Sequence, residues 1–176
     1  MKIIEGQFAG TVVDYKENKG TRVTSEKVRK AVFDILKNII DLENIKVADI
    51  FCGSGMYGLE ALSRGAGEVF FVDSDRGIIS RLKDSIKKME IKNVFFENKR
   101  FESFVEQNRS FDLIFADPPY YDFDFTKINK VFNIMNENGV LVLESSKRIM
   151  IGDLENLTLI SEKKYGDTKV YFYIKK

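Results

Sequence analysis

Val47-Ala-Asp-Ile-Phe-Cys-Gly-Ser-Gly-Met-Tyr-Gly58 carries the strongest indication of the fold in this chain. It opens with the apolar run of a buried strand, and its glycines then follow the spacing G-x-G-x-x-G: Gly53, Gly55 and Gly58. That spacing between a strand and a helix is typical of a backbone that turns tightly and approaches a ligand closely. The stretch therefore predicts a strand at 46–51, a ligand-binding turn, and a helix at 56–64.

Beyond this turn the chain alternates between strand and helix patterns. Apolar runs predict further strands at 68–73, 93–97, 112–117 and 139–144, and amphipathic patterns predict helices at 75–89, 101–108 and 125–136. Such alternation is typical of a mostly parallel sheet with helices on both faces. The tail differs, because alternating runs at 157–164 and 169–175 flank a turn and predict an antiparallel hairpin. The expected fold is α/β and Rossmann-like, with seven strands in one sheet.

The first 45 residues have a different pattern. Residues 2–8 and 11–15 alternate around Ala9-Gly10, which predicts a small hairpin. Thr24-Ser-Glu-Lys27 carries capping chemistry and opens an amphipathic helix. We therefore expect an N-terminal hairpin and helix extension at 1–45, packed on a core at 46–176 within a single domain.

Composition excludes several kinds of chemistry. The 176 residues are 44% hydrophobic and 31% charged, which is ordinary for one soluble globular domain. With one cysteine, Cys52, and no histidine, an internal disulfide, His-based catalysis and a thiolate zinc site are excluded, and no metal is expected. No apolar run reaches the length of a membrane span, and Met1-Lys-Ile-Ile-Glu5 lacks the apolar core of a signal peptide, so a cytoplasmic protein is expected.

Charge is unevenly distributed along the chain. Residues 1–40 hold 8 basic and 5 acidic side chains, residues 41–144 hold 13 and 18, and residues 145–176 hold 7 and 4. Mildly basic terminal segments around an acidic middle favour a polyanionic partner that binds to the two terminal segments. Solvated faces give the same pattern, so both interpretations stay open.

A second informative stretch is Phe111-Asp-Leu-Ile-Phe-Ala-Asp-Pro-Pro-Tyr-Tyr121, which contains both prolines of the chain. Prolines fix their φ angles and carry no backbone donor, so the predicted strand has a rigid exit rich in oxygen acceptors. The carboxylate of Asp117 and the ring of Tyr120 complete a socket for a planar group that bears an NH2. The alternative is an ordinary polar turn after a core strand.

The glycine turn alone fits a nicotinamide dinucleotide as well as other nucleotides. Asp73, about twenty residues later, ends the next strand, where a carboxylate commonly binds ribose hydroxyls. Asp49 lies beside the turn and would oppose a pyrophosphate on the helix N-terminus. A ligand with a ribose, a positive charge and no phosphate suits Asp49 better, and S-adenosylmethionine is such a ligand. Alternatively, Asp49 is an acid satisfied by backbone N–H groups.

A methyl donor would explain the socket. An exocyclic amine is a poor nucleophile because its lone pair is delocalised into the ring. Accepting its N–H groups on Asp117 and a prolyl carbonyl would favour a pyramidal nitrogen, while Tyr120 would stack on the base at about 1–3 kcal/mol. In an open α/β sheet the two motifs meet where the strand order reverses.

These residues resemble the class I S-adenosylmethionine-dependent methyltransferases, and more closely the bacterial family that methylates the exocyclic N2 of one guanine in 16S rRNA. The resemblance spans nearly the whole chain. It rests on these stretches: Gly6-Gln-Phe-Ala-Gly10, Arg22-Val-Thr-Ser-Glu-Lys-Val-Arg29, Asp49 to Arg64, Val72-Asp-Ser-Asp75, Asp117-Pro-Pro-Tyr120 and Leu143-Glu-Ser145.

The resemblance implies a role for each motif. The residues expected around S-adenosylmethionine are Asp49, Phe51, Gly53, Ser54, Gly55, Gly58, Asp73 and Ser74. Arg100-Phe101 occupies the position where the family bonds the adenine amine, and because arginine has no acceptor, backbone groups or stacking are expected to replace that bond. The residues expected to hold the guanine are Asp117, Pro118, Pro119 and Tyr120. Arg22, Thr24 and Arg29 are expected to contact RNA.

The expected partner is 16S rRNA within the small ribosomal subunit or an assembly intermediate. The nearest alternative is an amine methyltransferase that acts on adenine N6 in DNA or RNA, or on protein glutamine. A nicotinamide-dependent oxidoreductase would explain the glycine turn but would leave Asp117-Pro-Pro without a function. A catalytically silent RNA-binding module is the remaining alternative.

Overall fold

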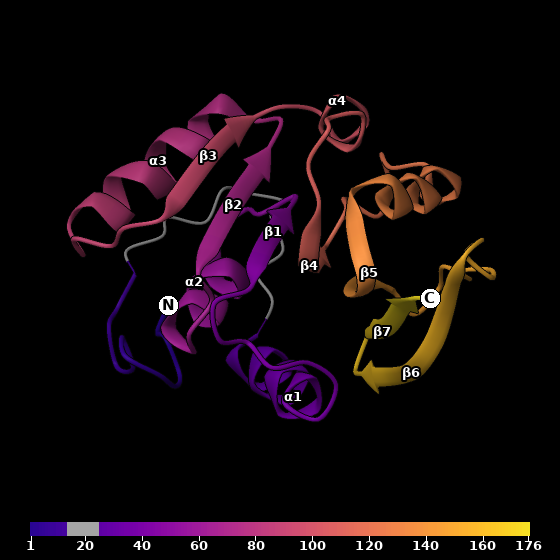
Figure 1. Ribbon diagram of the computed structural model, residues 1–176, viewed down its shortest axis with the longest axis horizontal. Coiled ribbons are helices and arrows are strands. Elements are labelled where there is room, and N and C mark those ends of the chain that lie inside the picture. The colour runs from indigo at the N-terminus through magenta and orange to yellow at the C-terminus, as the bar shows by residue number, and fades with distance from the viewer. Residues whose placement is uncertain (14–24) are drawn as a thin grey trace.

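Seven strands form one sheet in the computed structural model, which describes residues 1–13 and 25–176 (Figure 1). The strands are β1 (Lys46–Ile50), β2 (Glu68–Asp73), β3 (Val94–Asn98), β4 (Phe111–Ala116), β5 (Met135–Ser146), β6 (Leu157–Tyr165) and β7 (Thr168–Lys175). Their order is β3-β2-β1-β4-β5-β7-β6. The first five strands are parallel, and β7 pairs antiparallel with both β5 and β6. The predicted Rossmann-like sheet with its C-terminal hairpin is confirmed.

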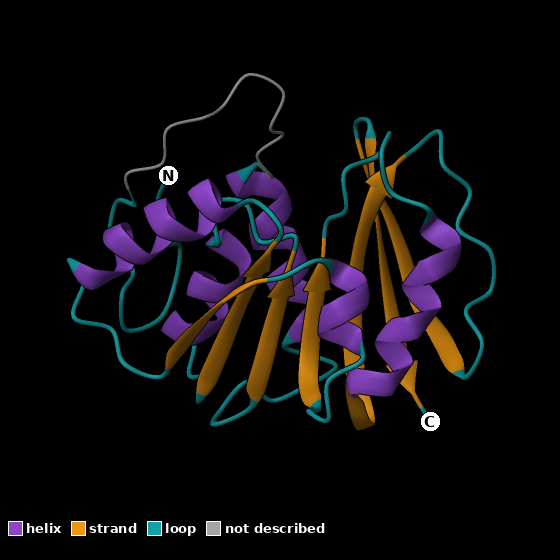
Figure 2. Cartoon of the chain, turned by 90° about the horizontal axis from the view of Figure 1, so that it is seen from above, coloured by secondary structure: helices purple, strands orange, loops and turns teal. Residues whose placement is uncertain are grey.

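Helices cover both faces of this sheet (Figure 2). They are α1 (Glu26–Leu36), α2 (Met56–Ser63), α3 (Arg76–Lys87), α4 (Phe101–Val105) and the 3-10 helix η1 (Phe125–Ile134). One apolar core joins α1, α2 and α3 to the sheet, and a second joins α4 and η1 to its other face. Because side chains alternate along a strand, Val47 belongs to the first core and Ala48 to the second. Within the described residues, no helix has the length and apolar character needed to cross a bilayer.

The helix expected at 125–136 differs from the structure. It is a 3-10 helix that ends at Ile134, and β5 starts at Met135 instead of residue 139. The start of β5 is irregular, because Asn138 has a φ of 61° and the register with β4 shifts between Phe111 and Leu113. Asn136-Glu-Asn-Gly139 therefore has the composition of a turn while lying within a strand.

The expected N-terminal hairpin is reduced to one antiparallel bridge, between Lys2 and Val12, and residues 5–10 form a turn instead of continuing the strand expected at 2–8. Ile3 donates its N–H to the carbonyl of Thr11 at 3.0 Å, and Val13 donates to Met1 at 2.7 Å. Helix α1 begins after Ser25, whose hydroxyl accepts the N–H of Val28 at 3.2 Å. Residues 14–15 of the expected second hairpin strand and Thr24, the first residue of the predicted capping stretch, lie outside the described residues.

Candidate active site

The two sequence motifs border one cavity at the carboxyl ends of the parallel strands. The order of the sheet reverses between β1 and β4, which places the turn after β1 beside the turn after β4. A cavity of about 620 Å³ lies there, a volume within the usual range for small-molecule sites. Its lining includes Phe51 to Ser54 from the glycine turn, Asp73 and Ser74 from the end of β2, and Asp117 to Asp122.

Two glycines of the turn are required by close packing. Gly55 has a φ of 69°, and a Cβ there would lie 2.8 Å from the methyl groups of Leu82 on α3. A Cβ on Gly58 would lie 2.4 Å from the ring of Phe71 on β2. Of the three glycines only Gly53 lines the cavity, so the expected contact of Gly55 and Gly58 with the cofactor stays a prediction.

Asp49 and Asp73 give this part of the cavity an acidic character. Asp73 accepts the N–H of Gly53 at 3.2 Å with one oxygen and that of Asp75 at 2.9 Å with the other. Asp49 is 3% exposed and accepts the N–H of Gly58 at 2.9 Å. Burial, with smaller contributions from the charges of Asp73 and Glu144, raises the pKa of Asp49 to about 8. A nearby cationic group would lower the free energy needed to ionise Asp49, whereas a phosphate would raise it.

The diproline corner is a closed turn. Pro118 is buried and Pro119 exposed, and the carbonyl of Pro119 accepts the N–H of Phe123 at 3.1 Å. Asp117 and Tyr120 are partly buried and line the cavity. The corner is therefore rigid. Of the two prolyl carbonyls, the one of Pro119 already accepts the hydrogen bond that closes the turn.

Tyr57 and Glu144 form a buried pair that sequence reasoning missed. The Tyr57 ring stacks on Phe115 at 4.7 Å between centroids and lines the cavity, while its hydroxyl donates to Glu144 on β5. Burial and the nearby carboxylates of Glu144, Asp117 and Asp49 raise the pKa of Tyr57 well above its ordinary value. The available signal was the position of Glu144, which directly follows the apolar run of a strand that ends at the same edge of the sheet.

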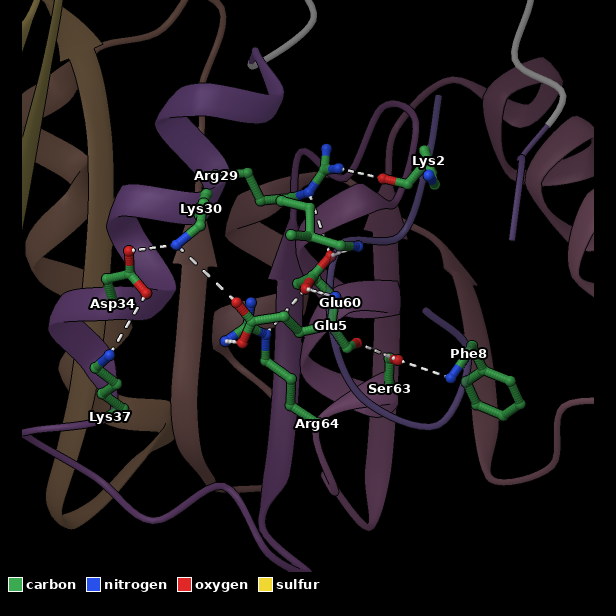
Figure 3. Close-up of polar contacts among 11 residues, drawn as sticks. Lys2, Glu5, Phe8, Arg29, Lys30, Asp34, Lys37, Glu60, Ser63 and Arg64 are labelled. Atoms are coloured by element: carbon green, nitrogen blue, oxygen red, sulfur yellow. Dashed lines mark hydrogen bonds and ion pairs between the residues drawn. The ribbon is translucent and has the colours of Figure 1, made fainter. Parts of the chain in front are cut away.

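Arg29 lies inside the protein. Its side chain is 1% exposed, its guanidinium donates to the carbonyl of Lys2, and its Nε lies 3.6 Å from a Glu60 oxygen (Figure 3). Glu60, on α2, also accepts the N–H groups of Ile4 at 2.8 Å and Glu5 at 3.0 Å. Arg29 therefore joins α1 to the N-terminal segment and α2. It also lines the cavity, and its contact with RNA stays a prediction. The other two expected RNA contacts, Arg22 and Thr24, lie outside the described residues.

The residues expected near adenine lie beside the cavity lining. Arg100 is exposed and precedes α4, while Phe101 is buried and stacks on Phe51 at 5.6 Å between centroids. Phe51 is the member of this pair that lines the cavity, so direct contact of Arg100 and Phe101 with the cofactor stays a prediction. Asn98, which sequence reasoning did not single out, donates to the carbonyls of Asp73 and Ser74 at 3.0 Å and fixes the end of β2.

Cys52 is buried, and burial raises the pKa of its thiol well above the ordinary value, so the residue is a small apolar side chain rather than a reactive thiolate. In the described part of the chain, no group of three or more acidic, cysteine or histidine side chains is arranged to hold a metal ion.

The strand order, the glycine turn and the diproline corner on one cavity define a class I S-adenosylmethionine-dependent methyltransferase. The chain belongs to the family described as conserved hypothetical protein 95, whose model matches residues 1–174.

Relatives and solved structures match most of the chain. It is similar to ribosomal RNA small subunit methyltransferase D of Buchnera aphidicola subsp. Acyrthosiphon pisum, with 28% identity over 98% of this chain and 92% of the relative. The protein of that name from Escherichia coli K12 is 30% identical over 82% of this chain and 71% of its own length. The solved yhhF protein of Escherichia coli superposes with a TM-score of 0.88 at 26% identity, covering 100% of this chain and 98% of that structure.

Proposed function

We propose that this protein transfers a methyl group from S-adenosylmethionine to the exocyclic N2 amine of a guanine in 16S rRNA of the small ribosomal subunit. The observation that carries the proposal is that the glycine turn and Asp117-Pro-Pro-Tyr120 border the same cavity. The rRNA substrate is supported by the relatives, which are named ribosomal RNA small subunit methyltransferase D.

The residues around the cavity fit S-adenosylmethionine. Both oxygens of Asp73 are held by backbone N–H groups at the end of β2, where they can also accept ribose hydroxyls. Asp49 is buried beside the glycine turn, where a positively charged ligand would stabilise its ionised form and a phosphate would destabilise it, which favours S-adenosylmethionine over a nicotinamide dinucleotide. When bound, S-adenosylmethionine supplies an electrophilic methyl group.

Asp117 and the carbonyl of Pro118 are assigned to the two N–H groups of the amine. Pro118 is chosen because the carbonyl of Pro119 is bonded to the N–H of Phe123. Two acceptors on one nitrogen localise its lone pair and make it a better nucleophile. The carboxylate of Asp117 then takes the proton that the methylated nitrogen loses, and Tyr120 stacks on the base. In a base pair the N2 amine donates one N–H to cytosine and cannot donate both to Asp117 and Pro118, so the target guanine must be unpaired or flipped out.

An assay with a labelled methyl donor tests the base and the substrate together. Purified protein is incubated with small ribosomal subunits, naked 16S rRNA or DNA; each nucleic acid is then digested to nucleosides, and the ribosomal proteins are digested to amino acids. We expect label in N2-methylguanosine from rRNA. Label found instead in N6-methyladenosine, or in protein glutamine alone, would show that the substrate is that amine and not guanine N2.

A further inference from the structure

Two exposed side chains stand at the mouth of the cavity, and neither has a role in holding the target base. Tyr121 follows the diproline corner after β4 and is 95% exposed. Arg148 belongs to the turn after β5 and is also exposed. Both residues line the cavity, so the two strand exits present an aromatic ring and a guanidinium to the same opening.

Both side chains are carried by a fixed backbone. The turn that holds Tyr121 is closed by the N–H of Phe123 on the Pro119 carbonyl at 3.1 Å. The turn that holds Arg148 is closed by the N–H of Ile149 on the Ser146 carbonyl at 3.0 Å. That second turn is also tied to the β6–β7 turn, because Lys147 donates its N–H to the Asp167 carbonyl at 2.8 Å and its ammonium pairs with the Asp167 carboxylate.

The adjacent basic residues Lys147 and Arg148 differ in their ion pairing. Lys147 is paired with Asp167, whereas no carboxylate of the described residues lies within 4.0 Å of the Arg148 guanidinium. A guanidinium binds phosphate oxygens through two parallel N–H bonds, and an exposed aromatic ring offers a face on which a base can stack. A ring and a guanidinium held at one opening therefore match the base and the phosphate of a nucleotide.

We propose that Tyr121 and Arg148 form a subsite for a nucleotide that flanks the target guanine, with the Tyr121 ring stacked on its base and the Arg148 guanidinium on its phosphate. The subsite rests on the proposed function, because it assumes that the neighbouring socket holds a base of an RNA strand. Stacking on Tyr121 requires a base that is not stacked within a duplex. The subsite therefore selects single-stranded or locally opened RNA.

Binding of a short fluorescein-labelled single-stranded RNA, measured by anisotropy in the presence of S-adenosylhomocysteine, tests the subsite without methyl transfer. We expect Tyr121→Ala to weaken binding about 5- to 150-fold, the range for one base stack, and Tyr121→Phe to bind like wild type because it keeps the ring. Arg148→Ala should reduce the slope of log affinity against log salt concentration by about 0.7, and Arg148→Lys should keep the slope because it keeps the charge. The matched control is Lys83→Ala on α3, which removes an exposed positive charge outside the cavity lining.

The outcomes separate this proposal from the proposed function. If Tyr121→Ala and Arg148→Ala bind the single strand as the Lys83→Ala control does, or if wild type prefers a duplex of the same sequence, the subsite is wrong even when the protein methylates guanine. If the two variants lose affinity as expected while wild type methylates no RNA, Tyr121 and Arg148 bind a nucleotide of single-stranded RNA, but the proposed function fails and the bound nucleotide does not flank a target guanine. In an active protein, the same two variants should raise the KM for RNA and leave the dissociation constant of S-adenosylhomocysteine unchanged.

Discussion

Replacing Glu60 should destabilise the protein more than any surface charge does. Its carboxylate is fully buried and accepts the N–H groups of Ile4 at 2.8 Å and Glu5 at 3.0 Å and the Nε–H of Arg64 at 2.9 Å. It is also the acidic partner of Arg29, which is 1% exposed. Glu60→Ala would leave that guanidinium buried without its counter-charge, a change that costs about 3–5 kcal/mol.

For a chain of this length each kcal/mol shifts Tm by about 2–4 °C, so Glu60→Ala should lower Tm by about 6–20 °C. Glu60→Gln keeps one carbonyl acceptor, so its Tm should fall between those of wild type and Glu60→Ala. The matched control is Glu137→Ala, which removes a carboxylate that is 72% exposed and lies 3.1 Å from Lys175. Such a surface pair is worth about 0–1 kcal/mol. If thermal unfolding gives Glu60→Ala and Glu137→Ala the same Tm, the contacts of Glu60 with the N-terminal segment do not stabilise the fold and the reasoning is refuted.

Three further predictions concern the cavity. The native pKa of Asp49, about 8, exceeds its ordinary 3.8, so the folded state holds a proton that the unfolded state releases, and wild-type stability should fall between about pH 4 and pH 8. Asp49→Asn should flatten the decline of Tm with pH. Parallel curves of Tm against pH for wild type and Asp49→Asn would contradict the raised pKa of Asp49. Tyr57→Phe should reduce the free energy of unfolding in urea by about 1–3 kcal/mol because the buried carboxylate of Glu144 loses a donor, and unchanged stability would show that this bond contributes nothing. S-adenosylhomocysteine should raise Tm and NADH should not, since NADH carries a pyrophosphate; stabilisation by NADH alone would favour an oxidoreductase.

The arrangement of the sheet could be predicted because it depends on local patterns. Alternation of strands and helices predicts parallel pairing, and the glycine turn and the diproline corner each follow a recognisable strand. Since right-handed connections leave few topologies for such a chain, the sequence alone could place the two motifs side by side. The C-terminal hairpin likewise follows from alternation around turn residues.

The missed features depend on partners that are distant in the sequence. Glu60 and its backbone donors at Ile4 and Glu5 are separated by 56 and 55 residues, and Tyr57 and Glu144 by 87. No local pattern specifies such pairs. The early start of β5 was missed for another reason: Gly139 and Asn138 have turn propensities, and the pairing of this segment with β4 overrides them.

In the proposed function Asp117 activates an amine beside the methyl donor, and the rate of a single methyl transfer measures that activation. Labelled donor and small ribosomal subunits are mixed with excess wild-type or Asp117→Ala protein, and the dissociation constant of S-adenosylhomocysteine is measured in parallel. Losing an acceptor aimed at the reacting nitrogen should cost about 2.7–4 kcal/mol, so the variant should bind S-adenosylhomocysteine like wild type and transfer methyl about 10²–10³-fold more slowly. Transfer at the wild-type rate by Asp117→Ala would contradict the role of this carboxylate.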